Sequence, residues 1–190
     1  LSVTSFALLA GCDRESARKE QAQADAAATE AALAKTAPIS FGLESAGGMK
    51  ANLSYAKRGT VAPAVPFTGA DGREVSLRDY AGRPLLVNLW ATWCAPCKAE
   101  MPTLDALAAL EEGQVSVIAV SQDLNGRAPV RTFFESAQIT NLEPFTDPDN
   151  GLLGAIGGNP ALPVTLLYDS DGREVWRVSG GVEWDDEEIA

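Results

Sequence analysis

The feature that most constrains the fold is an apolar run of strand length that leads directly into two cysteines. The run covers residues 85–90 (Leu-Leu-Val-Asn-Leu-Trp), the cysteines are Cys94 and Cys97, and a helical pattern of apolar residues continues to Leu110. This order predicts a strand, a short loop and a helix whose N-terminus holds Cys94. Unpaired backbone N–H groups and the helix dipole favour a thiolate at that position. A thiol at Cys97, one helical turn further on, could resolve a mixed disulfide.

Three other interpretations compete with a redox-active dithiol. A structural disulfide across so short a loop would constrain little of the unfolded chain. Zinc usually takes four Cys or His ligands, whereas the chain has no histidine and only one further cysteine, Cys12, so that only a site shared between chains stays open. Two inert buried thiols are the third possibility, and Pro96 between the cysteines with Trp93 before them argues against it. The spacing therefore favours redox chemistry.

The residues around the cysteines resemble a known family. The segment Trp93-Cys94-Ala95-Pro96-Cys97-Lys98 is similar to the active-site motif of thioredoxin-fold proteins. Residues 90–104 resemble the TlpA/ResA branch of membrane-anchored thiol–disulfide oxidoreductases, and the match extends over residues 64–181. The resemblance implies an α/β fold: a thioredoxin-like mixed sheet flanked by helices, with an N-terminal hairpin and an inserted strand–helix segment.

Charge excludes one class of partner. The net charge is −11, and residues 59–190 hold eight Lys and Arg against twenty Asp and Glu, which gives −12 for that part. Phosphate contacts need Lys and Arg, so we expect no nucleic-acid partner.

The first residues predict secretion and a lipid anchor. Residues 1–11 are apolar, too short to span a bilayer, and look like the remnant of a signal peptide. Leu9-Ala10-Gly11-Cys12 resembles a bacterial lipobox, which implies lipid attachment at Cys12 and firm anchoring by several acyl chains. An ordinary signal peptide is the alternative. Asp13 implies retention at the inner membrane, so the expected location is the periplasmic face of the bacterial cell envelope.

Residues 12–60 are predicted to carry the anchor, a stalk and a linker. Residues 13–37 are polar and alanine-rich without an apolar stripe, which suits an isolated helix or disorder. Residues 39–60 contain several glycines and are expected to continue as linker with a short strand at best. The thioredoxin-like domain is expected over residues 61–190. Its end at 185–190 reads as a helix cut short or as a solvated acidic tail, and we expect the sequence to be incomplete at both ends.

Within that domain, periodicity and turn residues predict the order of elements. They are a hairpin over 68–77 with Asp71-Gly72 at its turn, a helical turn over 76–82, strands over 85–90, 115–121, 164–168 and 174–178, a helix over 127–137 and a short helix over 151–156. A right-handed crossover through the helix after Cys97 is expected to connect the first two buried strands.

A second candidate functional element is Ala161-Leu162-Pro163-Val164-Thr165. A proline just before a strand cannot donate to the sheet, and it commonly marks a turn or a cis bond. Its place resembles the thioredoxin cis-proline loop, which implies that Leu162 and Pro163 lie beside the reactive cysteine and bind an extended substrate. A strand-entry proline in trans is the alternative.

The residue that handles protons in the resembling thioredoxins is replaced here, so that the role lies on another residue or is absent. Where a thioredoxin carries a buried aspartate, this chain has Asn88, and an amide takes up no proton. Glu100 follows Cys97 by three residues and shares its helix face. The resemblance carries an active-site glutamate onto Glu100, and a solvated helix carboxylate is the alternative.

The function expected from the resemblance is reduction of disulfides in extracytoplasmic protein clients by the Cys94/Cys97 dithiol. Trp93 and Pro96 would contribute to the substrate surface, a membrane electron donor would re-reduce the pair, and no cofactor or metal is expected. The clients implied are cytochrome c or copper-oxidase assembly proteins. Ala95-Pro96 lacks the histidine of strong oxidants such as DsbA, which favours a reductase. A Cu(I)-binding assembly module and a non-catalytic docking domain with the same fold stay open as alternatives.

Overall fold

The computed structural model describes residues 40–44, 48–157 and 161–185. The predicted signal remnant, Cys12, the stalk and the last residues of the acidic tail lie outside this part of the chain. The described residues all belong to one compact unit. In the described ranges, no helix is both long and apolar enough to cross a bilayer.

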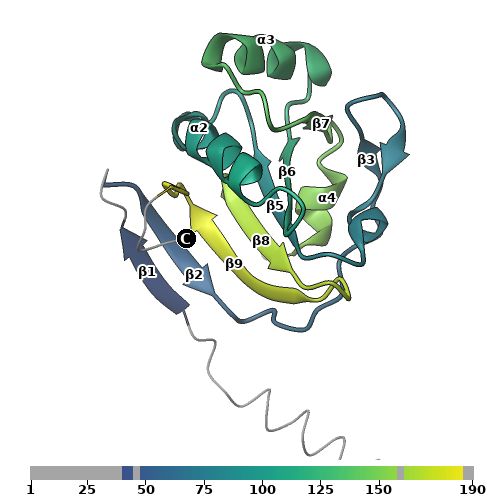
Figure 1. Cartoon of the computed structure of the whole chain (residues 1–190), viewed down its shortest axis with the longest axis vertical. Coiled ribbons are helices and arrows are strands. Elements are labelled where there is room, and N and C mark those ends of the chain that lie inside the picture. The colour runs from purple at the N-terminus through teal and green to yellow at the C-terminus, as the bar shows by residue number, and fades with distance from the viewer. Residues whose placement is uncertain (1–39, 45–47, 158–160, 186–190) are drawn as a thin grey trace, which may run out of the picture. The chain divides into compact units, whose positions relative to one another are not determined.

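The described strands form one mixed sheet of nine, in the order β1-β2-β9-β8-β5-β6-β7-β3-β4 (Figure 1). The strands are β1 (Ser40–Glu44), β2 (Lys50–Ser54), β3 (Phe67–Thr68), β4 (Glu74–Val75), β5 (Leu85–Trp90), β6 (Ser116–Ser121), β7 (Pro144–Thr146), β8 (Val164–Tyr168) and β9 (Glu174–Gly180). The helices are the 3₁₀ turn η1 (Leu77–Tyr80), α2 (Ala95–Leu110), α3 (Arg127–Ala137) and α4 (Gly151–Ala155).

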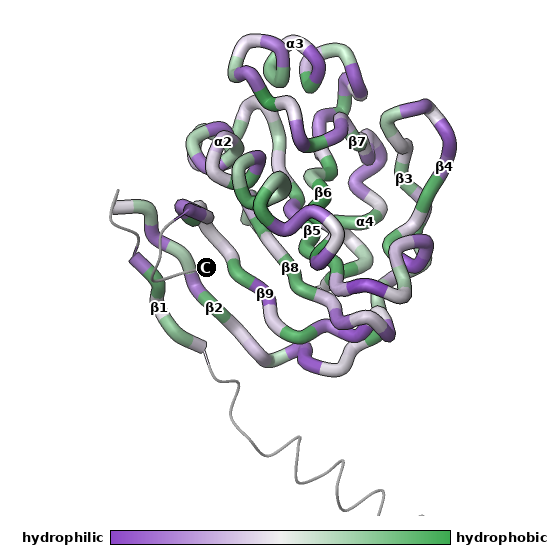
Figure 2. The backbone as a smooth tube through the Cα atoms, in the orientation of Figure 1, coloured by the Kyte–Doolittle hydropathy of each residue, from purple (hydrophilic) through white to green (hydrophobic). Residues whose placement is uncertain are grey.

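β5 is the centre of the sheet and is buried along its whole length. It pairs in parallel with β6 and antiparallel with β8. Its side chains alternate between two cores, because successive residues of a strand point to opposite faces. Leu86 and Trp90 pack in the cluster that contains residues of α2 and α3, whereas Val87 and Leu89 pack in the cluster that contains α4. Figure 2 shows apolar residues concentrated on the central strands and polar residues between β3 and β4.

Most of the predicted elements are confirmed. β5, α3 and β8 have the predicted bounds, β6 begins one residue later, and the β3–β4 hairpin turns at Asp71-Gly72 as expected. β9 continues to Gly180, two residues beyond the prediction. β7 was not predicted, since it has three residues, begins with proline and shows no alternation.

The prediction of a linker with a short strand at best over residues 39–60 is wrong for residues 40–44 and 50–54, which form two strands. β1 and β2 form an antiparallel hairpin, and β2 pairs with β9 with Leu53 opposite Val178. Both segments alternate, but each is only five residues long with two apolar side chains, so the strand pattern is easily overlooked. Three apolar side chains of these strands pack against the core cluster that contains residues of α2 and α3; they are Leu43, Ala51 and Leu53. The sheet therefore begins at Ser40 and not at residue 61.

Candidate functional site

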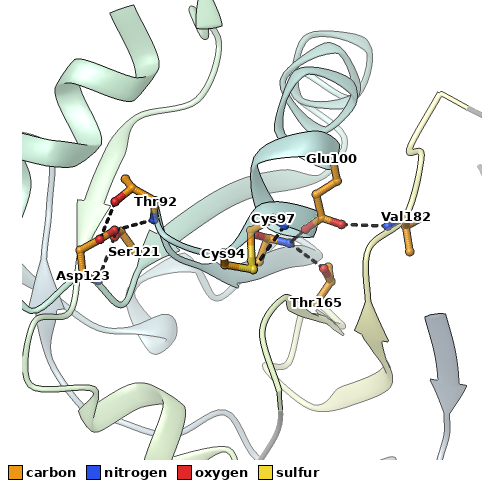
Figure 3. The surroundings of a disulfide bond; sticks show 9 residues. Thr92, Cys94, Cys97, Glu100, Ser121, Asp123, Thr165 and Val182 are labelled. Carbon is orange, nitrogen blue, oxygen red and sulfur yellow. Dashed lines mark hydrogen bonds between the residues drawn. A yellow bond between two sulfur atoms is a disulfide. The ribbon is translucent and has the colours of Figure 1, made fainter. Parts of the chain in front are cut away.

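Cys94 occupies the N-cap of α2, directly after the loop that leaves β5. Its Sγ accepts a hydrogen bond from the Cys97 backbone N–H at 3.3 Å, and the two sulfurs are joined in a disulfide (Figure 3). Pro96 fits the first turn of the helix, where no acceptor is available for its missing N–H. The sulfur of Cys94 therefore lies at the positive end of a 16-residue helix.

The two cysteines differ in access to solvent. Cys94 is 6% exposed and Cys97 is 0% exposed. Around Cys94 the surface is formed by Pro96 and by Trp93, whose side chain is 68% exposed. A partner can therefore reach the pair at Cys94 only.

Glu100 is fully buried, one helical turn beyond Cys97, so the alternative of a solvated helix carboxylate is wrong. Its Oε1 accepts a hydrogen bond from Asn88 Nδ2 at 2.7 Å, and its Oε2 accepts one from the Val182 backbone N–H at 2.9 Å (Figure 3). Asn88 Nδ2 also donates to Thr165 Oγ1 at 2.9 Å. One buried network thus joins β5, α2, β8 and the segment after β9.

Burial raises the pKa of Glu100 to about 7, from 4.5 for the free side chain. The hydrogen bonds from Val182 and Asn88 oppose this shift, since they stabilise the carboxylate. The indole of Trp184 also lowers the pKa of Glu100, although its N–H makes no direct hydrogen bond within the described residues. Glu100 can therefore hold or release a proton near neutral pH.

The peptide bond between Leu162 and Pro163 is cis, which confirms the prediction and excludes the trans alternative. Pro163 is buried and its carbonyl oxygen accepts a hydrogen bond from Gly180 N–H at 2.9 Å. Leu162 is half-buried and packs on the same cluster as Cys94. Two residues after Pro163, Thr165 lies opposite Asn88 in the sheet.

A second buried carboxylate, Asp123, was missed by the sequence analysis. It accepts hydrogen bonds from the Thr92 backbone N–H at 2.9 Å, from Thr92 Oγ1 at 2.6 Å and from Ser121 Oγ at 2.6 Å (Figure 3). We call these three residues the Asp123 network. The signal was available, because the loops after neighbouring parallel strands, here β5 and β6, meet at one edge of a sheet.

The β1–β2 hairpin, expected to be linker, also reaches the site. A Cβ atom placed on Gly181 would lie 3.0 Å from Met49 Sδ and 3.5 Å from Pro96 Cβ. Met49 lies in the turn before β2, so the N-terminal hairpin and the end of β9 border the first turn of α2. No cluster of three or more His, Cys, Asp or Glu side chains suited to a metal ion occurs within the described ranges.

Comparison with known proteins gives the family. Residues 57–190 match the family described as Redoxin. The chain belongs to the redoxin family. Thiol-disulfide oxidoreductase ResA of Geobacillus thermodenitrificans (strain NG80-2) is a relative that is 33% identical over 129 residues, 67% of this chain and 72% of the relative. The predicted TlpA/ResA-like identity is thereby confirmed, and this redoxin is a thiol–disulfide oxidoreductase.

Solved structures of related proteins confirm the thioredoxin-like α/β fold. The exposed lipoprotein thioredoxin Etrx1 of Streptococcus pneumoniae strain TIGR4 is 26% identical with a TM-score of 0.56, over 64% of this chain and 93% of the other. The thioredoxin domain of a thiol-disulfide oxidoreductase from Bacteroides vulgatus is 25% identical with a TM-score of 0.55, over 68% of this redoxin and 91% of that chain.

Proposed function

We propose that this redoxin reduces disulfides in extracytoplasmic proteins, with Cys94 as the nucleophile and Cys97 as the resolving thiol. The observation that carries the proposal is that Cys94 keeps some exposure whereas Cys97 has none, together with the place of Cys94 at the start of α2. A nucleophile needs both a surface that a protein disulfide can approach and an environment that favours the thiolate.

The reaction proceeds in two exchanges. The Cys94 thiolate attacks one sulfur of the client disulfide, forming a Cys94–client bond and releasing the other client sulfur as a thiolate that takes up a proton. Cys97 then loses its proton and attacks Cys94 Sγ, which releases the second client thiol. Two electrons have passed to the client, and the enzyme is left with the Cys94–Cys97 disulfide present in this structure.

Glu100 is assigned the proton transfer in the second exchange. It is buried on the helix face of Cys97, and a pKa of about 7 lets it accept the Cys97 proton without help from solvent. Asn88 fixes the position of the carboxylate, since it donates to Oε1 from the central strand.

The client is bound by residues on either side of Cys94. Trp93 and Pro96 supply exposed apolar surface, and Leu162 and Pro163 form the loop that leads into β8. An extended client segment would lie across this surface with its cysteine at Cys94 Sγ, as the family resemblance implies.

Electrons and anchoring come from the membrane in this proposal. Cys12 carries the lipid, after a signal peptide over residues 1–11, and residues 13–37 form the stalk on the periplasmic side of the inner membrane. The lipobox-like Leu9-Ala10-Gly11-Cys12 supports this, as does the likeness to an exposed lipoprotein thioredoxin. A membrane protein would re-reduce the disulfide, and the clients would be assembly proteins of cytochrome c or of copper oxidases.

Trapping tests the proposal. The Cys97→Ser variant cannot complete the second exchange, so the reduced variant should accumulate a mixed disulfide with its client that thiol reagents cleave. The double variant Cys94→Ser/Cys97→Ser is the control and should trap nothing. A Cys97→Ser protein that forms no mixed disulfide with any protein disulfide, insulin included, would leave only a docking domain with this fold.

A further inference from the structure

Two strongly exposed apolar residues, Trp93 and Leu124, lie on two loops that are hydrogen-bonded to each other. Trp93 is 68% exposed and directly precedes Cys94, whereas Leu124 is 76% exposed in the loop between β6 and α3. Single exposed apolar residues are common on protein surfaces, but two on joined loops, one of them directly before the reactive cysteine, suit a binding surface.

The Asp123 network fixes these two loops to each other. Thr92, the residue before Trp93, donates both its backbone N–H and its hydroxyl to Asp123, the residue before Leu124. Ser121, at the end of β6, donates to the same carboxylate, which is almost completely buried. Both carboxylate oxygens are therefore used to hold the loop of Cys94 against the loop of Leu124.

We propose that Leu124 and Trp93 together bind the apolar segment that flanks the cysteine of a client protein, and that Asp123 is the positioning residue of this surface. The inference rests on the function proposed above and adds a residue for client recognition. Its occupant is a polypeptide, because Trp93 directly precedes the cysteine that must form the mixed disulfide and Asp123 ties the loop of Leu124 to the same segment. Tryptophan at the centre of such a contact is the residue type that most often dominates binding.

A small disulfide distinguishes recognition from chemistry. Oxidised glutathione reaches Cys94 without covering the surrounding surface, whereas insulin is a protein disulfide that must dock. The reduced full chain is mixed with either disulfide, and the quantity of interest is the ratio of kcat/KM for insulin to that for glutathione disulfide.

Leu124→Ala should lower this ratio about fivefold, through a higher KM for insulin, as expected for removal of one apolar contact from an interface. Leu110→Ala is the matched control, because Leu110 is 72% exposed at the opposite end of α2 and should leave the ratio unchanged. An unchanged ratio in Leu124→Ala, or an equal fall in Leu110→Ala, would overturn the docking surface. A wild-type protein that reduces neither disulfide would overturn the proposed function itself.

The positioning role of Asp123 has its own pair of variants. In Asp123→Asn the amide oxygen can accept from Thr92 N–H and Ser121 Oγ, and the amide group can donate to Thr92 Oγ1, so the contacts persist without the charge. Asp123→Ala removes them all. The ratio should fall about fivefold in Asp123→Ala, again through KM, and recover in Asp123→Asn. Thr92→Val, which loses only the hydroxyl contact, should give a smaller fall. An equal fall of the ratio in Asp123→Asn and Asp123→Ala would overturn the positioning role. So would a lower melting temperature of Asp123→Ala without any change in the ratio of kcat/KM values.

Discussion

Asn88 on the central strand donates a hydrogen bond of 2.7 Å to Glu100 on α2, and neither side chain is exposed to solvent. In a thioredoxin, one buried carboxylate on the strand could both make the buried hydrogen bonds and titrate. Here these two tasks belong to two residues. Asn88 supplies a fixed donor, whereas the titrating group belongs to the helix that carries both cysteines. The proton acceptor therefore belongs to the same helix as Cys97.

Stability should depend on pH through Glu100. Below 4.5 the carboxyl is protonated in both the folded and the unfolded chain; between 4.5 and about 7 only the folded chain keeps the proton. The free energy of unfolding should therefore fall as pH rises through this window, by about 3 kcal/mol at most, and level off above it. Urea unfolding of the oxidised protein at several pH values measures this. Glu100→Gln should flatten the profile, whereas the exposed control Glu112→Gln should not.

Release of the client should slow when Glu100 cannot accept a proton. In Glu100→Gln we expect the second exchange to be slower by about tenfold or more, with the first exchange at Cys94 nearly unchanged. Rapid quenching with an alkylating agent, followed by mass spectrometry, separates the mixed disulfide from the closed disulfide. Equal rates of closure in the variant and the wild type at every pH would exclude Glu100 as the acceptor.

The same substitution should have opposite effects at two glycines. Gly180→Ala would place a Cβ 2.4 Å from the Lys50 carbonyl oxygen, at a φ of +107°, and should cost about 2–4 kcal/mol while loosening β2 from β9. Gly154 lies in α4 with open space around its Cα, so Gly154→Ala should stabilise by about 0.5–1 kcal/mol. Thermal unfolding of both variants shows whether each substitution stabilises or destabilises the protein. An unchanged stability of Gly180→Ala would contradict the close packing of β2 on β9.

Asp105 should matter for stability and not for the reaction. Its buried carboxylate accepts the backbone N–H groups of three consecutive residues ahead of β7, which are Thr140, Asn141 and Leu142. Asp105→Ala leaves these donors without an acceptor and should cost about 2–4 kcal/mol. The exposed Asp149→Ala should change stability by less than about 0.5 kcal/mol. Chemical denaturation checks the difference, and the rate of glutathione disulfide reduction at low temperature should be the same in both variants.

The parts of the fold that could be predicted are those whose sequence pattern lies within one short segment. β5 is a continuous apolar run because it is buried on both faces, and the Cys-x-x-Cys spacing marks the helix start that follows. The cis bond before Pro163 came from the family resemblance, since a proline before a strand is compatible with either isomer.

The parts that were missed depend on distant partners. β1 and β2 become strands because β9, more than a hundred residues later, offers a free edge to β2. Asp123 looks like an ordinary loop carboxylate unless β5 and β6 are recognised as parallel neighbours, which brings its loop next to Thr92. The burial of Glu100 likewise depends on Val182, from the far end of the domain.

The complete burial of Cys97 in the oxidised protein has a kinetic consequence. Whatever re-reduces the enzyme must attack Cys94 Sγ, the same atom that later attacks the client. The reducing partner and the client therefore compete for one surface and cannot be bound together during exchange. Turnover should follow ping-pong kinetics, and an excess of either protein should inhibit the half-reaction of the other.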